Sequence, residues 1–486
     1  MHEIHEREVK FEVPDGWSVP DVSTLGPDGA TVEQHQQELH TTYFDTEDYD
    51  LLRGHITLRR RTGDADEGWH LKIPAGKQAR DEIHESLDDS TEPPAALSDL
   101  VVGLTGGAAL RPIAILHTRR TAYRLADPNA TVLLEVADDH VDATALGRPA
   151  TMRQWREVEV ELVDGDASLL KQAGRRLIKS GASESTSRSK LARALAADDE
   201  PPTPAAKRAG DSLHEVIGGF VREQCDVIVR TDVDLRRDHN VVHVARVGTR
   251  RLRSVLRVFA QEFDAERARA LESELRWYGG LLGAVRDCQV LRERLRAAVS
   301  ALAPEIVLGP VQARIEESLS TRERDARRTL AEARSGERYR ALLATLRSWS
   351  QELPWVTPDR RSHDLADYLE AAERKVNKRL KNARSAPDPE EALHRARKAG
   401  KRARYVAELA EPVLGKQARN LVKRLKSLQD ELGDLQDSVV ATEFLRLAGA
   451  RAGTTPGENG FTFGILWAQE QEAARMAVRS APKRLG

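Results

Sequence analysis

The segment Glu157-Val158-Glu159-Val160-Glu161-Leu162 alternates acidic with apolar residues. Successive side chains of a β-strand point to opposite faces, so its glutamates share one face and its valines share the other. The apolar face must pack against protein, and the charged face must meet either bulk water or a polar lumen. A closed β-barrel whose outer face packs against helices provides such a lumen. The segment therefore predicts a strand whose charged face is either solvated or turned into a barrel.

Short alternating segments of the same kind fill the first 165 residues. Clusters of Gly, Pro and Asp separate them, which is typical of antiparallel β-structure. Residues 166–196 have the spacing of a helix and are expected to end this unit. The expected strands include residues 6–10, where Glu6, Glu8 and Lys10 share a face, residues 56–61, where Arg59 and Arg61 share a face, and residues 69–73, 131–136 and 157–162.

The character of the sequence changes near residue 200. The stretch DDEPPTPAAKRAG at residues 198–210 is rich in Pro and polar residues, and it predicts a linker. From Asp211 onward, Arg, Ala, Leu and Glu recur at helical spacing, which predicts a helical bundle. We therefore expect an α+β protein, with an N-terminal antiparallel β-domain at residues 1–197 and a C-terminal all-α domain at residues 211–480.

The helical part contains an internal repeat that begins at two histidines. Basic residues follow both His243 and His394 at offsets of +3, +7, +8 and +10. The motif Gly283-x-x-Arg286-Asp287 is echoed by Gly433-x-x-Gln436-Asp437, at nearly the same distance from each histidine. Two matches in the same register indicate a duplicated unit. We therefore expect two similar helical-bundle halves, each resembling a four-helix bundle.

Each copy of the repeat forms a basic ridge on a helix. At about 100° per residue, the histidine of each copy and the basic residues at offsets +3, +7 and +10 fall within an arc of about 80°. A row of charge on a helix is commonly a solvated face, but two copies of one pattern favour a groove that binds anions. The second ridge is shorter, because Glu408 takes its fifth position. The ridge residues are His243, Arg246, Arg250, Arg253 and Arg257 in the first copy, and His394, Arg397, Lys401 and Arg404 in the second.

The overall composition restricts the class of partner. Charged residues make up 31% of the chain, yet its net charge is only −2, so any binding site for ions must be local. Basic stripes also bind the phosphates of nucleic acids. These ridges lack the interleaved aromatic residues that stack single-stranded bases, and we expect no specific nucleic-acid partner.

The small number of cysteines and the lack of long apolar stretches indicate the cellular location. Its two cysteines, Cys225 and Cys288, cannot form a disulfide scaffold, which fits a reducing compartment. No stretch approaches about 18 consecutive apolar residues, and the first ten residues have no apolar signal-peptide core. We expect a cytoplasmic protein without a membrane partner.

A lumen that holds both carboxylates and cations suits a metal-bound polyphosphate. Carboxylate oxygens bind the hard cations Mg²⁺ and Mn²⁺. Arg and Lys bind phosphoryl oxygens, Arg often through two parallel hydrogen bonds. Two metal ions can clamp such a substrate and activate water for in-line attack.

The first 195 residues resemble the CYTH family, also called triphosphate tunnel metalloenzymes. Glu6-x-Glu8-x-Lys10 matches the ExExK signature of that family. The ordered set of motifs carries the resemblance, which implies an eight-stranded antiparallel tunnel that hydrolyses triphosphates with Mg²⁺ or Mn²⁺. The further motifs, in the order of the family, are Tyr43-Phe44-Asp45, Leu58-Arg59-Arg60-Arg61, Trp69-His70-Leu71-Lys72, Arg80-Asp81-Glu82, Thr118-Arg119-Arg120, Glu135 with Asp138-Asp139, the strand at 157–162, and Ser187-Arg188-Ser189-Lys190.

The resemblance also implies roles for individual residues. Lys10 and Glu82 are the expected catalytic residues, and Lys10 also contacts phosphate. Three alternatives stay open, namely Arg120 for Arg119, Asp138 for Asp139 and Glu161 for Glu157. The expected metal ligands are Glu6, Glu8, Glu157 and Glu159, joined by Glu135 and Asp139. The expected substrate contacts are Arg59, Arg61, Lys72, Arg80, Arg119 and Lys190.

Residues 211–479 resemble the CHAD family of helical domains. The motifs His243-x-x-Arg246-x-x-x-Arg250-Arg251-Leu252-Arg253 and Gly283-x-x-Arg286-Asp287 carry this resemblance. The family is associated with binding of inorganic polyphosphate, and its members often follow a CYTH domain in one chain. Glu408 and Gln436 depart from the first repeat and suggest weaker binding by the second half.

The two resemblances together imply metal-dependent hydrolysis of inorganic triphosphate or a related triphosphate, with polyphosphate bound by the helical domain. Thiamine triphosphate, tripolyphosphate and nucleoside triphosphates are all candidate substrates. One alternative is an adenylate cyclase, an activity that the CYTH name includes. A second alternative is a polyphosphate-binding scaffold whose tunnel has no activity. Polyphosphate granules in the cytoplasm are an expected place of association.

Overall fold

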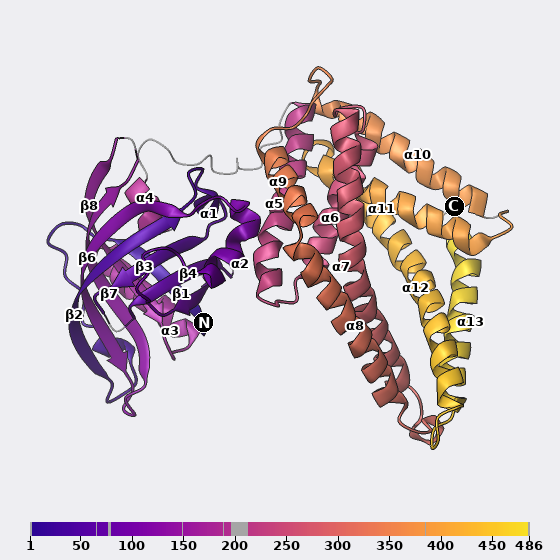
Figure 1. The fold of residues 1–486 in the computed structure, drawn as a ribbon, viewed down its shortest axis with the longest axis horizontal. Helices are drawn as coiled ribbons and strands as arrows, with labels where there is room; N and C mark the ends of the chain where they lie inside the picture. The colour runs from indigo at the N-terminus through magenta and orange to yellow at the C-terminus, as the bar shows by residue number, and fades with distance from the viewer. Residues whose placement is uncertain are drawn as a thin grey trace. The chain divides into compact units, whose positions relative to one another are not determined.

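In the computed structural model, the chain folds into two compact units (Figure 1). The structure describes residues 2–64, 66–75, 79–147, 149–187, 189–195, 212–383 and 385–484. The linker expected at residues 198–210 lies outside these residues.

The first unit is built on a β-sheet that closes on itself. Neighbouring strands are antiparallel in the order β5-β4-β3-β2-β6-β7-β8-β1-β9, and β5 also pairs with β1. The pairing of β5 with β1 closes the eight strands from β1 through β8 into a barrel, and β9 is attached beside β1. The predicted eight-stranded antiparallel tunnel is confirmed. The strands are β1 (His2–Glu12), β2 (Thr31–Asp45), β3 (Thr57–Thr62), β4 (Gly68–Pro74), β5 (Ala79–Glu85), β6 (Arg111–Ala126), β7 (Val132–Ala145), β8 (Thr151–Leu162) and β9 (Ser183–Glu184).

Helices cover parts of the barrel wall. The valines Val158 and Val160 of β8 are fully buried, in a cluster that contains Leu170 and Leu177 of helix α3. The alternating pattern of β8 therefore packs its valines outward against α3 and turns its glutamates inward. The helical segments are η1 (Ser23–Leu25), α1 (Asp50–Arg53), α2 (Ala95–Thr105), α3 (Ala167–Lys179) and α4 (Lys190–Leu195).

The stretch expected to be helical, residues 166–196, forms two helices with a short strand between them. Helix α3 ends at Lys179, the short strand β9 pairs with β1, and helix α4 then begins at Lys190. Leu191 and Ala194 of α4 are buried beside Tyr43 and Leu116 of the barrel. This packing places the first residue of α4, Lys190, against the lumen.

The second unit is helical, and the predicted repeat is visible in its chain order. Helices α5 to α8 and α10 to α13 form two successive series in which each helix packs on the next, and α9 packs on α5. In Figure 1, α7 with α8 and α12 with α13 form two long antiparallel pairs. The helices are α5 (Leu213–Arg236), α6 (Val242–Val258), α7 (Ala265–Ser300), α8 (Val311–Ser335), α9 (Glu337–Gln351), α10 (Leu365–Ala383), α11 (Pro389–Leu414), α12 (Lys416–Ala452) and α13 (Phe461–Arg484), with the short turns η2 (Pro304–Ile306) and η3 (Ser362–Asp364).

The two helical halves contact each other in several places. At the ends of the long pairs, Leu295 and Ile315 of the first half share an apolar cluster with Phe444 and Phe463 of the second. Elsewhere α6 of the first half packs on α11 of the second. In the part of the chain that the structure describes, no helix is both long and apolar enough to span a bilayer.

The buried carboxylate of Asp45 organises the turn between β2 and α1. Its Oδ1 accepts hydrogen bonds from the backbone N–H groups of Thr46 and Leu51, and its Oδ2 accepts one from Leu52. The substitution Asp45→Ala leaves these donors without their acceptor and should lower the free energy of unfolding by about 2 kcal/mol. Calorimetric unfolding of the full chain measures this. The variant Asp48→Ala removes the same charge from an exposed position nearby, and equal destabilisation by both changes would contradict the assigned role.

Candidate functional site

The lumen of the barrel contains a cavity in which cations are the largest group of lining side chains. Two of its lining residues are carboxylates, Glu8 and Glu159, and the remainder include Thr41, Tyr43 and Thr118. Inward-facing alternate positions of several strands supply the charged groups, as strand geometry requires. The cations that line it are Lys10, Arg59, Arg61, Lys72, Arg80, Arg120 and Lys190. The cavity is therefore suited to a compact and highly charged anion.

One group of lumen charges centres on Glu82 of β5. Its Oε1 accepts a hydrogen bond from Arg59 at 3.2 Å and lies 3.5 Å from Nζ of Lys72. Nζ of Lys72 also donates to Glu6 at 2.5 Å. Burial disfavours the charged form of Glu82, but Lys72, His70 and Arg59 outweigh it and hold the pKa of this carboxyl far below its ordinary value. Glu82 is thus an ionised group that positions cations and is a weak proton acceptor.

A second group of lumen charges centres on Lys190 of α4. Its Nζ lies 2.9 Å from Asp139, 2.9 Å from Glu157 and 2.7 Å from Glu159. Burial opposes the charge of Lys190, but these carboxylates raise its pKa well above the ordinary value. Arg120 donates to both oxygens of Asp139 at 2.8 Å and to Glu159 at 3.2 Å. Lys10 is also hydrogen-bonded to Glu159.

A row of carboxylates crosses three neighbouring strands. Glu8 of β1 pairs in register with Glu161 of β8, which pairs in register with Glu135 of β7. Like charges at directly opposed positions destabilise a sheet. Burial raises the pKa of Glu161. Burial and a hydrogen bond with Glu82 also raise the pKa of nearby Glu6 to about 8, against the effect of Lys72.

This carboxylate row, Glu8, Glu161 and Glu135 together with Glu6, fits a hard divalent cation. Oxygen donors are the ligands that Mg²⁺ and Mn²⁺ prefer. A cation among them would also relieve the repulsion between the opposed glutamates.

The structure separates the alternatives that the sequence left open. Arg119 is 62% exposed and lies 3.7 Å from Asp142 on the outer surface, so its predicted role as a substrate contact is wrong. Its neighbour Arg120 lines the lumen instead, because consecutive residues of β6 point to opposite faces. Asp139 faces Arg120, whereas Asp138 accepts two hydrogen bonds from Arg156.

Glu157 and Glu161, the two alternatives for one metal-ligand position, lie in different surroundings. Glu157 accepts a hydrogen bond from Nε1 of Trp155 at 2.6 Å and is paired with Lys190. Glu161 belongs to the carboxylate row. The sequence reasoning gave no role to His70, which is 1% exposed and hydrogen-bonded to Glu82 at 2.9 Å. The sequence did contain a signal for a lumen position of His70, since this residue is two residues from Lys72 and shares its face of β4.

In the helical unit, the two predicted ridges face each other where α6 packs on α11. Nε of Arg250 on α6 donates to the hydroxyl of Tyr405 on α11 at 2.6 Å. Arg246 donates to Asp287 at 2.9 Å and to the backbone oxygen of Gly283 at 3.3 Å. A single basic site, formed by both repeats, therefore replaces two separate ridges.

Four cations of this site repel one another. Burial, followed by the charges of Arg397, Arg250 and Arg246, lowers the pKa of Lys401 to about 7. Burial and neighbouring cations also lower the pKa of His243 and of His394. We refer to Arg246, Arg250, Arg397 and Lys401 as the basic cluster. Such a cluster gains stability from a bound anion.

The remaining ridge residues are largely neutralised by carboxylates. Arg253 and Arg257 both donate to Glu272 of α7, at 2.8 Å and 2.7 Å. Arg404 lies 3.2 Å from Glu408 on its own helix. The periodicity of α6 did not reveal Glu272, because this acid comes from a neighbouring helix.

The comparisons with known proteins agree with the order of the two units. A CYTH domain model matches residues 5–195, and a CHAD domain model matches residues 219–446. The uncharacterized protein Rv2226 of Mycobacterium tuberculosis is 36% identical over 493 residues, which cover 96% of this chain and 93% of that relative. The solved CHAD domain of the plant Ricinus communis is 27% identical with a TM-score of 0.46, over 58% of this chain and 96% of that chain. PptA from Streptomyces chartreusis is 21% identical with a TM-score of 0.47, over 56% of this chain and 99% of that chain.

The depressed pKa of Lys401 can be measured directly. Reductive ¹³C-methylation of the lysines should give one NMR signal that titrates near pH 7, and Lys401→Arg should remove that signal. Replacing a neighbouring cation in Arg250→Gln should move the titration toward the ordinary lysine value, near 10.4, because it removes part of the repulsion. A Lys401 signal that titrates at the ordinary value in the wild-type chain would show that the cations are not close together.

Proposed function

The chain belongs to the family of proteins in which a CYTH domain is followed by a CHAD domain, and from this premise we propose that its tunnel hydrolyses inorganic triphosphate or a related triphosphate with Mg²⁺ or Mn²⁺. The observation that supports the proposal best is the pairing of a cation-lined cavity with an adjacent row of carboxylates. The first binds phosphoryl oxygens and the second binds divalent cations.

The carboxylate row would hold the metal ion. Glu8, Glu135 and Glu161 supply oxygen donors from three adjacent strands, and Glu6 adds a fourth from β1. A divalent cation held there would polarise a phosphoryl oxygen and would lower the pKa of bound water. Glu159, Glu157 and Asp139, also predicted as ligands, are better placed to hold Lys10, Lys190 and Arg120 in position.

The cations of the cavity would bind and orient the triphosphate. Arg59, Arg61 and Arg80 offer several N–H donors each, and Arg guanidinium groups match pairs of phosphoryl oxygens. Lys10, Lys72 and Lys190 supply compact charges to the same space. Cations held by buried carboxylates are fixed before the substrate arrives, which favours stabilisation of charge that develops during phosphoryl transfer. Water attacks the terminal phosphorus while its bond to the bridging oxygen breaks, releasing phosphate and diphosphate.

Glu82 fits a positioning role better than that of a general base. A general base works best with a pKa near the operating pH, whereas the pKa of Glu82 lies far below it. Its contacts with Arg59 and Lys72 hold two phosphate-binding cations in place.

For the helical unit, we propose that the basic cluster binds inorganic polyphosphate. Arg246 and Arg250 come from one repeat and Arg397 and Lys401 from the other, so one chain of phosphates could contact both. His243 and His394 lie on the same helices and are less charged near neutrality, because the pKa of each is lowered. A bound polyanion would relieve the repulsion among the four cations.

Two other functions are separated from this one by simple assays. An adenylate cyclase would convert ATP into cyclic AMP and diphosphate, whereas a triphosphatase releases orthophosphate. An inactive polyphosphate-binding scaffold would release neither product. Release of phosphate from tripolyphosphate, thiamine triphosphate and ATP, with Mg²⁺ and with Mn²⁺, together with formation of cyclic AMP from ATP, distinguishes the three functions.

Removal of one carboxylate from the row should disable the tunnel. The variant Glu8→Gln keeps the size of the side chain, and we expect kcat/KM for tripolyphosphate to fall on the order of 10²-fold or more, since metal binding contributes several kcal/mol to such a reaction. The matched control is Glu33→Gln, which removes the same charge from an exposed position of β2. Activity of Glu8→Gln equal to that of the control at low Mg²⁺ would contradict the proposed metal site.

Charge reversal in the basic cluster should abolish polyphosphate binding. We expect Arg250→Glu with Arg397→Glu to weaken binding of long-chain polyphosphate at least about a hundredfold and to reduce its salt dependence, because fewer counterions are released. The control is Arg328→Glu with Arg374→Glu, the same charge change at positions 67% and 70% exposed. Circular dichroism checks that helicity is kept. Equal losses in both double variants would mean that binding is diffuse.

A further inference from the structure

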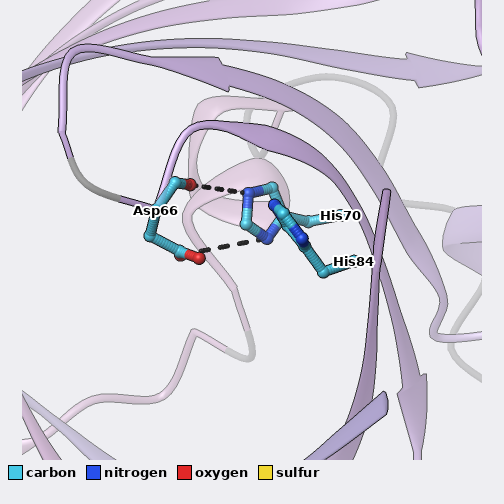
Figure 2. Close-up of side chains that lie close together, drawn as sticks. All are labelled: Asp66, His70 and His84. Atoms are coloured by element: carbon cyan, nitrogen blue, oxygen red, sulfur yellow. Dashed lines mark hydrogen bonds and ion pairs between the residues drawn. The ribbon is translucent and has the colours of Figure 1, made fainter. Parts of the chain in front are cut away.

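Two histidines and an aspartate meet at one point of the barrel wall (Figure 2). The proposed tunnel chemistry assigns none of the three as a ligand, although Asp66 contacts Arg61 and His70 contacts Glu82. His70 of β4 and His84 of β5 are direct cross-strand partners. Asp66 comes from the segment between β3 and β4. One possible ligand atom of each residue lies within 4.8 Å of those of the other two.

The ring of His70 is oriented as metal-binding histidines are. Its Nε2 lies 3.0 Å from the backbone oxygen of Asp66, and its Nδ1 lies 2.9 Å from Oε1 of Glu82 and 4.0 Å from the Asp66 carboxylate. Both close neighbours are hydrogen-bond acceptors, and a neutral ring has only one hydrogen to donate. With that hydrogen on Nε2, a cation bound at Nδ1 would take the place of the missing donor toward Glu82. Metal-ligating histidines commonly tie their second ring nitrogen to a backbone carbonyl in this way.

Gly68 makes room for the second imidazole. A Cβ atom at this position would lie 2.1 Å from Nε2 of His84, closer than any side chain tolerates. The absence of a side chain therefore lets the His84 ring lie across β4, where its centroid is 4.9 Å from that of His70 in an edge-on arrangement. The two rings are fixed by the backbone of two paired strands.

The third ligand can approach the other two. Zinc bonds of about 2.0–2.2 Å in a tetrahedral site place ligand atoms about 3.3 Å apart, so the three groups must draw slightly closer. The side chain of Asp66 is 57% exposed and belongs to the connection between strands, which can shift more easily than the sheet. Two imidazoles and a carboxylate also leave a position for water or a fourth ligand.

We propose that Asp66, His70 and His84 form a second cation site, selective for a borderline divalent transition metal such as Zn²⁺ or Co²⁺. Imidazole nitrogen suits these ions, whereas Mg²⁺ prefers ligands that are all oxygen. The site thus differs in chemistry from the carboxylate row and does not depend on the proposed triphosphatase activity. Binding there would tie the β3–β4 connection to β5.

The test uses Co²⁺ as a spectroscopic probe on the full chain in a large excess of Mg²⁺. The wild-type protein should bind one Co²⁺ with visible absorption bands, and Zn²⁺ should displace it. We expect His84→Gln and Asp66→Asn each to weaken this binding at least about a hundredfold, because each removes a direct ligand and even supporting groups contribute ten- to hundredfold. His84 and Asp66 are not buried, so these variants should fold even where a change at His70 would not.

Two controls decide where the probe binds. His117→Gln alters one of the stacked pair His40 and His117, whose rings are 4.7 Å apart on the same barrel, and should leave binding unchanged. Glu8→Gln should also leave it unchanged, since Glu8 belongs to the carboxylate row. The proposal is overturned if His84→Gln and Asp66→Asn bind Co²⁺ as the wild type does. It is equally overturned if excess Mg²⁺ or Glu8→Gln removes the bound Co²⁺.

Discussion

The pairing of β1 with β5 is the constraint on which the first unit depends. In an open sheet, the charged face of a strand such as β8 would be solvated and its charges would interact weakly. Closure turns the same side chains toward one another in a confined space, where opposite charges attract and like charges repel strongly. Each lumen charge must therefore lie beside an opposite charge or a ligand. Lys190, held by three carboxylates, shows the first solution. At the carboxylate row, where Glu6 and Glu8 already contact Lys72 and Lys10, the proposed metal would add the second.

The helical unit places like charges together by another route. Helix α6 packs on α11, and this packing brings Arg250 of one repeat to Tyr405 of the other. A phenol accepts the hydrogen bond of the guanidinium without cancelling its charge. Burial, together with the charges of Arg397, Arg250 and Arg246, lowers the pKa of Lys401, although Arg246 is itself paired with Asp287. Where Glu272 enters, at Arg253 and its neighbour, the charge is neutralised instead. The distribution of acids thus favours the basic cluster over the rest of the repeat as the proposed anion site.

Sequence patterns predicted which side chains share a face, but not what that face meets. The alternation at residues 157–162 gave the strand and its charged side, whereas closure of the barrel was expected from family resemblance alone. Arg119 and Arg120 are two consecutive arginines that the sequence alone does not distinguish. Only the pairing of β6 with its neighbours determines which one enters the lumen. In the same way, helical periodicity identified the basic residues of α6 and α11. It did not predict that they face each other, because that is a property of tertiary packing.

The donor atoms of the barrel divide its possible cation sites into two chemical classes. The carboxylate row offers oxygen alone, and oxygen donors favour hard cations that keep part of their hydration shell. The cluster around His70 offers two imidazoles fixed by paired strands, which favours ions that bind nitrogen strongly. Glu82 lies between these classes, since it contacts both His70 and Arg59, a proposed phosphate contact. A cation that changed the hydrogen bond of His70 would therefore act on a carboxylate that positions the cations of the tunnel. Selectivity between the two sites follows from donor type, without any need for one site to exclude the other by size.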